Sequence, residues 1–111
     1  MEKPTLSIIT VNFNNNGGLK KTLSSVSQQS FAFYEHIIID ACSTDGSLET
    51  IVEYAKDNSH VTFWVSEQDK GIYDGMNKAI DHSSGEYLLF LNSGDFLLTY
   101  VLNKIPFDGT K

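Results

Sequence analysis

The stretch GEYLLFLNSGD, residues 85–95, joins a strongly apolar segment directly to a polar turn that ends in a carboxylate. Tyr87 to Leu91 show no alternation of apolar and polar residues, so we expect both faces of this strand to be buried. Such burial is typical of a parallel strand in a sheet that helices cover on each side. Ligands of these sheets bind at the carboxyl ends of the strands, which is where Asp95 falls.

Three further apolar segments predict strands, at residues 6–13, 35–41 and 60–65. Between the strands, apolar residues recur three and four positions apart, which predicts amphipathic helices. The stripes are Leu19, Leu23 and Val26, then Leu48, Ile51, Val52 and Ala55, then Ile72, Met76, Ala79 and Ile80. We expect residues 96–105 to form a short helix or an irregular segment before Pro106.

This alternation of strands and helices predicts an α/β fold with a parallel sheet of about four strands and helices on both faces. Right-handed crossovers leave few topologies, and we favour strand order 3-2-1-4, a Rossmann-like mononucleotide-binding half. The length of 111 residues predicts a single domain over residues 1–111.

Charge and composition exclude several classes of function. The net charge of −6 and the absence of arginine argue against a nucleic-acid surface, which needs a basic stripe. We see no signal peptide and no run of about 20 apolar residues that would span a bilayer, so we expect a cytoplasmic protein. The single cysteine, Cys42, excludes an internal disulfide, and we expect a packed thiol there. The histidines lack metal-ligand spacing and are expected at the surface or at sheet edges.

Polar residues follow the ends of the predicted strands. Thr10 and Asn12 close the first strand, Asp40 the second, Asp69 lies in the loop after the third, and Asp95 follows the fourth. A nucleotide suits this edge, because Asp40 would accept a hydrogen bond from a base N–H. A divalent cation at Asp95 would bridge to the phosphates. The sequence contains neither G-x-x-x-x-G-K-[ST] nor G-x-G-x-x-G, which favours phosphate binding through a metal.

Four motifs in order extend over nearly the whole chain: LSIITVNFN, IIIDACSTDGS, SEQDKGIYDGMNKAI and GEYLLFLNSGD. With them the sequence resembles the family 2 glycosyltransferases, inverting sugar-nucleotide enzymes of the GT-A fold. The SEQDKGIYDGMNKAI form looks most like bacterial enzymes that build surface polysaccharides.

The resemblance implies roles for particular residues. It places Thr10, Asn12 and Asp40 at the nucleoside, with Asp40 facing the base, and it places Asp69 and Asn77 around the nucleotide-sugar pocket. The turn at residues 92–95 stands where the family usually has Asp-Ser-Asp-Asp, a site for Mg²⁺ or Mn²⁺. Asn92 and Gly94 each replace an acid there, Ala41 replaces the second Asp of another common pair, and Asp95 remains as the metal ligand.

In this family the general base and most of the acceptor site come from a later segment, so we expect no catalytic base in this chain. The resemblance therefore implies the donor-binding half of a transferase, truncated before the acceptor region and inactive alone. The sugar would come from a nucleotide donor, UDP-linked by our expectation, and pass to a glycan or lipid-linked acceptor. That acceptor would bring the protein to the inner face of the membrane.

Two other functions remain open. A non-catalytic remnant of such a domain would bind a nucleotide or a partner chain without turnover. A receiver-type or flavodoxin-like domain would use the acidic edge for phosphate. A receiver, however, would be expected to have paired acids after its first strand, where this chain has Asn12 and Asn14. In each case the last strand leaves an open sheet edge, from which we expect a homodimer or aggregation.

Overall fold

The computed structural model describes residues 4–68, 70–98 and 101–104. Its elements are β1 (Leu6–Asn12), α1 (Asn16–Ser27), β2 (Tyr34–Asp40), α2 (Ser47–Asp57), β3 (Val61–Ser66), α3 (Ile72–Asp81), β4 (Tyr87–Phe90) and a 3₁₀ turn, η1 (Val101–Lys104). The predicted alternation of strands and helices is confirmed, with boundaries that differ by a residue or so. Within the described residues, no helix is both long and apolar enough to cross a membrane.

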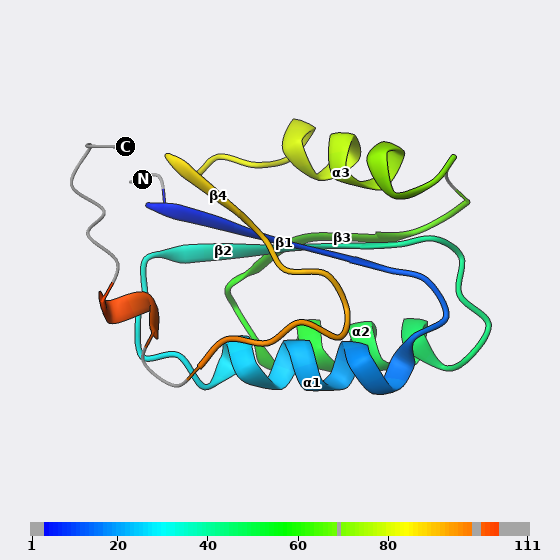
Figure 1. Cartoon of the computed structure of the whole chain (residues 1–111), viewed down its shortest axis with the longest axis horizontal. Coiled ribbons are helices and arrows are strands. Elements are labelled where there is room, and N and C mark those ends of the chain that lie inside the picture. The colour runs from blue at the N-terminus through cyan, green and yellow to red at the C-terminus, as the bar shows by residue number, and fades with distance from the viewer. Residues whose placement is uncertain (1–3, 69, 99–100, 105–111) are drawn as a thin grey trace.

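The four strands form one parallel sheet in the order β3-β2-β1-β4, as predicted. Helices α1 and α2 lie on one face of the sheet and α3 lies on the other (Figure 1). The register pairs Asn12 with Asp40 at the ends of β1 and β2. The carboxyl ends of the two central strands therefore meet at one edge, where the loops that follow them also begin.

The centre of the sheet carries the core. Every residue of β1 and β2 is buried, because these strands have neighbours on both sides and helices on both faces. The predicted stripe of α1 is confirmed, since Leu19, Leu23 and Val26 are all buried. Leu19 and Leu23 pack with Ile38 and Ile51 in one cluster, which fixes α1 and α2 against the central strands.

The prediction that the last strand is buried on both faces is wrong. Leu88 is 42% exposed and Phe90 37% exposed, although the opposite face of β4 packs on the core through Leu89. Helix α3 packs mainly on β1 and β2 and leaves these two side chains at the edge partly uncovered. An apolar run alone does not distinguish an edge strand from a central one.

Two residues of the predicted helix stripes also lie outside the core. Val52 on α2 and Ile80 on α3 are exposed, whereas Ile51 and Ala79 are fully buried. The buried part of each of these helices is therefore narrower than its apolar stripe. Residues 96–105 include an irregular segment and the 3₁₀ turn η1, as expected, while Pro106 lies outside the described residues.

A buried carboxylate ties the amino ends of the strands together. Glu35 at the start of β2 accepts hydrogen bonds from Ser7 Oγ at 2.6 Å, Thr62 Oγ1 at 2.9 Å and the Ser84 backbone N–H at 2.6 Å. These hydrogen bonds, with burial opposing them, hold the pKa of Glu35 below its ordinary value. Glu35 therefore has a structural role, because it holds together the end of the sheet that lies away from the polar loops.

Candidate functional site

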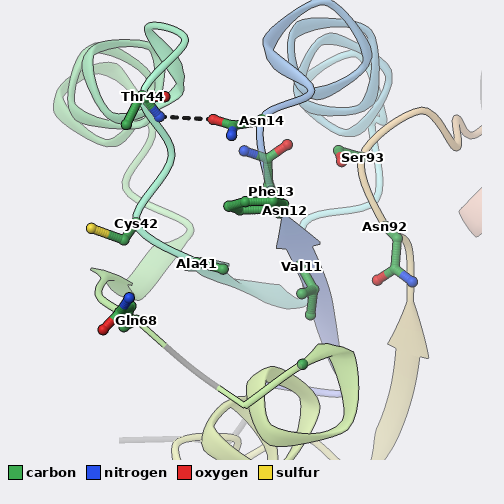
Figure 2. Close-up of a pocket in the computed structure, with 11 residues that line it drawn as sticks. Val11, Asn12, Phe13, Asn14, Ala41, Cys42, Thr44, Gln68, Asn92 and Ser93 are labelled. Atoms are coloured by element: carbon green, nitrogen blue, oxygen red, sulfur yellow. Dashed lines mark hydrogen bonds between the residues drawn. The ribbon is translucent and has the colours of Figure 1, made fainter.

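A cavity of about 760 Å³ opens at the carboxyl edge of the sheet, at the position predicted for a ligand. Its volume is in the range of small-molecule and cofactor sites. Figure 2 shows Asn92 and Ser93 on one side and Cys42, Thr44 and Gln68 on the other. The described lining residues carry no charged side chain, and they are Val11, Asn12, Phe13, Asn14, Ala41, Cys42, Thr44, Gln68, Gly71, Asn92 and Ser93.

Asp40 lies at the end of β2 and is fully buried. Its Oδ1 accepts from Asn12 Nδ2 at 2.7 Å and from Ser43 Oγ at 2.6 Å. Its Oδ2 accepts from the Ser43 backbone N–H at 2.9 Å and from Ser66 Oγ at 2.8 Å. The carboxylate thus joins β1, β3 and the loop after β2, and it lies outside the residues that line the cavity.

Asn12 ends β1 and forms part of the cavity wall, although its side chain is almost entirely buried. Because a carboxylate only accepts, the amide nitrogen must face Asp40 and the amide oxygen must point away. That oxygen, Oδ1, has no hydrogen-bond partner among the described residues. A buried acceptor without a partner costs about 1–3 kcal/mol, so this atom is a candidate contact for a ligand or a water molecule.

The loops that follow β1 and β2 hold each other through side chains. Asn14 donates from its backbone to Ser43 Oγ at 2.8 Å, and its Oδ1 accepts from the Thr44 N–H at 2.7 Å. Asp45 accepts from the Asn16 N–H at 2.8 Å at the start of α1, and it also accepts from Ser47. These contacts fix the loops that form the cavity wall.

Phe13 and Cys42 are two of the lining residues that were not assigned to the site from the sequence. Phe13 is 63% exposed, so its ring presents an apolar surface inside an otherwise polar loop. The expectation that Cys42 is packed is wrong, because a φ of 60° turns this residue out of the strand direction and leaves it exposed. The signal for Phe13 was an aromatic residue directly after a buried strand and before three asparagines.

The turn after β4 is held against α1. Thr22 Oγ1 donates to the Asp95 carbonyl at 2.5 Å and accepts from the Gly94 N–H at 3.0 Å. Gly94 has a φ of 100°, which favours glycine and explains why an acid does not occupy this position. Asp95 is exposed, and its Oδ2 accepts from the Asn92 N–H at 3.1 Å.

The structure brings together part of the predicted set of site residues. Asn12, Asp40 and the turn that carries Asp95 meet at the same edge of the sheet. Thr10 is fully buried in the core, where its hydroxyl is 2.8 Å from His36 Nε2. Asn77 is exposed on α3 and does not line the cavity. Asp69 lies outside the described residues.

The turn at residues 92–95 has oxygen donors that suit a hard cation. Asn92 Oδ1 has no partner among the described residues, and the Asp95 carboxylate lies on the same turn. Mg²⁺ is commonly held by one or two carboxylates together with substrate phosphates, so these residues fit a cation that a nucleotide completes. Within residues 4–68, 70–98 and 101–104 no group of three or more His, Cys, Asp or Glu residues is placed to hold a metal alone.

The family model of glycosyl transferase family 2 matches residues 7–105. The chain belongs to this family. The matched range contains both central strands, the cavity and the turn with Asp95. The resemblance drawn from the sequence motifs is thereby confirmed.

Two curated relatives in the family come from bacteria. The chain is 43% identical over 94 residues to a glycosyltransferase of Mycobacterium tuberculosis named as uncharacterized, covering 83% of this chain and 34% of the relative. It is 36% identical over 93 residues to TuaG of Bacillus subtilis, named for teichuronic acid biosynthesis, covering 84% and 37%. The chain therefore spans about a third of the length of the relatives it matches.

Solved structures confirm that this family 2 chain has the GT-A fold. A mannosyltransferase from Pyrobaculum calidifontis, in complex with GDP-Man and Mn²⁺, superposes with a TM-score of 0.74 at 21% identity, covering 84% of this chain and 28% of that one. Residues 1–349 of Staphylococcus aureus TarS, in complex with UDP-GlcNAc, give 0.72 at 25% identity, covering 82% and 27%. Both are larger than this chain.

Proposed function

We propose that the chain binds the nucleotide part of an activated sugar and forms the donor-binding part of an inverting glycosyltransferase. The observation that carries this proposal is the cavity at the carboxyl edge, which is lined by Asn12, whose buried Oδ1 has no partner among the described residues, and by Asn92 and Ser93 of the turn after β4. Complexes of two structural neighbours with sugar nucleotides support it. We take UDP as the first nucleotide to test.

In this proposal different residues contact the base and the diphosphate of the nucleotide. The exposed ring of Phe13 offers a face on which a base stacks. Asp95 and Asn92 Oδ1 would hold a cation, which would supply positive charge beside the diphosphate. The roles of Thr10, Asp69 and Asn77 in binding the nucleotide sugar remain proposals that rest on the resemblance. Thr10 is fully buried, so its effect on the nucleotide would be indirect, through the residues that it contacts.

The glycosyl transfer itself needs groups beyond the described cavity wall. An acceptor hydroxyl attacks the anomeric carbon, the bond to the diphosphate breaks, and a carboxylate takes the hydroxyl proton. The described lining residues include no carboxylate, so the base comes from outside them. The name of TuaG supports a polysaccharide acceptor, free or lipid-linked, and we place the reaction at the cytoplasmic face of the membrane.

The same lack of a carboxylate favours a second candidate, a nucleotide-binding remnant without turnover. The two candidates predict the same binding and differ in catalysis. Hydrolysis or transfer of a UDP-linked hexose by the chain would establish the enzyme. Binding of UDP with no turnover, alone or with a supplied acceptor, would favour the remnant.

Titration calorimetry of the chain with UDP, with and without Mn²⁺, tests the donor site. We expect Mn²⁺ to strengthen binding about tenfold or more, and Asp95→Ala to remove that gain. Asp57→Ala is the matched control, because Asp57 is an exposed acid at the end of α2. Binding that is equally strong without Mn²⁺ and in Asp95→Ala would discard the metal role, and a folded chain that binds neither UDP nor GDP would discard the function.

A further inference from the structure

The carboxylate of Asp40 has no free acceptor site for a ligand. A carboxylate offers about four lone-pair sites, and the four hydrogen bonds from Asn12, Ser43 and Ser66 use two on each oxygen. The residue is also fully buried and absent from the cavity wall. A base N–H that approached Asp40 would have to displace a protein donor, which argues against the direct base contact expected from the sequence.

Asn12 has the free hydrogen-bond acceptor that Asp40 lacks. Its amide nitrogen is fixed on Asp40 Oδ1 at 2.7 Å and lies 3.4 Å from Ser43 Oγ, so its orientation is determined. Its Oδ1 is left as a buried acceptor with no partner among the described residues, on a residue that lines the cavity. The neighbouring Phe13 is 63% exposed and lines the same cavity, so its ring is available to a base that enters beside Asn12.

We propose that Asn12 Oδ1 is the acceptor that recognises the base of the nucleotide, and that Asp40 is a positioning residue that holds the Asn12 carboxamide in place. This inference rests on the proposed function and specifies how its donor is selected. The acceptor is neutral and takes one ring N–H, the group that uracil presents at N3 and guanine at N1. Cytosine has an acceptor nitrogen at that ring position. Its lone pair would face the Asn12 oxygen, so a cytosine nucleotide would bind less well.

Ala41 and Cys42 agree with this assignment. Both follow Asp40 and line the cavity, and neither side chain offers a strong acceptor to a base. Asn14 Oδ1 is already engaged by the Thr44 N–H at 2.7 Å. Among the lining residues of β1 and its following loop, Asn12 is thus the one with a free amide oxygen in the part of the chain that the structure describes.

The test is binding of UDP against N3-methyl-UDP by calorimetry, with GDP against N1-methyl-GDP as a second arm. Methylation removes the N–H and should weaken binding about tenfold in the unaltered chain, as for loss of one buried hydrogen bond. In Asn12→Leu the methylated and unmethylated nucleotides should bind equally. In Asp40→Asn both should bind more weakly, with the ratio between them retained.

Asn12→Ala serves as a second variant if Asn12→Leu fails to fold, because it removes the amide oxygen without adding bulk at this buried position or leaving another acceptor there. The inference is overturned if methylation has no effect on the unaltered chain while UDP or GDP binds. It is also overturned if the effect persists in both Asn12 variants and disappears in Asp40→Asn. Absence of any nucleotide binding would instead refute the proposed function on which it rests.

Discussion

His36 is a titratable residue enclosed in the core, on the face of β2 that packs on α1 and α2. It is fully buried, with Nε2 2.8 Å from Thr10 Oγ1 and Nδ1 3.4 Å from the hydroxyl of Tyr54. Burial lowers the pKa of His36 from 6.5 to about 3, with a smaller contribution from His60. Burial also raises the pKa of Tyr54, so this hydroxyl stays neutral and supplies no negative charge to offset a charged imidazole.

The lowered pKa of His36 predicts a loss of stability in mild acid. Below pH 6.5 His36 binds a proton in the unfolded chain but stays neutral in the folded chain. The free energy of unfolding therefore falls as pH decreases. Between pH 8 and pH 5 the loss should reach about 2 kcal/mol from this residue, since each pKa unit is worth about 1.4 kcal/mol. Urea unfolding measured at half-unit steps over this range checks the prediction.

His36→Gln is the control for this titration, because glutamine is neutral throughout and still reaches Thr10. The variant should lose most of the dependence on pH between 6.5 and 5, whatever its stability at pH 8. Glu35 contributes little in this window, since its ordinary pKa is 4.5 and its folded value lies below that. An unchanged slope in the variant would assign the effect to other groups.

The same residues show what the sequence could predict at this scale. Asn12 and Asp40 were predictable, because a polar residue at the end of a fully buried strand is unusual and strand ends converge. The burial of His36 contradicts the expected surface position, and the pairing with Thr10 explains it. Two polar side chains on neighbouring strands satisfy each other in the core, and a single sequence does not reveal such a pair.

At the scale of elements, the strand order was predictable and the exposure of the strands was not. Alternating strands and helices with right-handed crossovers lead to β3-β2-β1-β4. The apolar run of β4 resembles that of β1, yet β1 has a strand on each side and β4 has one. How far a helix extends over a sheet depends on its crossing geometry, which the apolar stripe of α3 does not encode.

The approach of β4 to β1 depends on Gly85. Its N–H donates to Ser7 Oγ at 2.8 Å, and a Cβ added to it would lie 2.6 Å from the Ser7 nitrogen and 2.7 Å from the Leu6 carbonyl carbon. Those backbone atoms belong to the central strand and cannot shift without disturbing the pairing with β2. We expect Gly85→Ala to lower the free energy of unfolding by about 3 kcal/mol, measured by urea unfolding.

Gly17→Ala is the matched control for Gly85→Ala, because an added Cβ at Gly17 meets nothing within 4 Å. Gly17 lies in the first turn of α1, where alanine should stabilise the helix by about 0.5 kcal/mol or leave it unchanged. Opposite signs for the two substitutions are expected. Equal effects would mean that the contact between residues 85 and 7 is not what limits the position of β4.

At the scale of the whole molecule, the outer edge of β4 has no strand partner among the described residues. Beside that edge, Leu88 and Phe90 expose large apolar side chains on the face that α3 leaves uncovered. Unpaired edges with apolar neighbours favour pairing with another chain. The described part of the chain therefore presents a surface suited to self-association.

We expect the chain at micromolar concentration to sediment as a dimer or larger species. The double substitution Leu88→Lys with Phe90→Lys should shift the chain toward monomer. Lysines on an edge strand repel each other across a symmetric contact, and burying their charged groups in that contact would cost hydration energy. Trp64→Lys is the matched control, since Trp64 is an exposed aromatic residue on β3 at the opposite edge of the same sheet. A monomeric unaltered chain would contradict the prediction, and a monomer produced by Trp64→Lys alone would move the contact to β3.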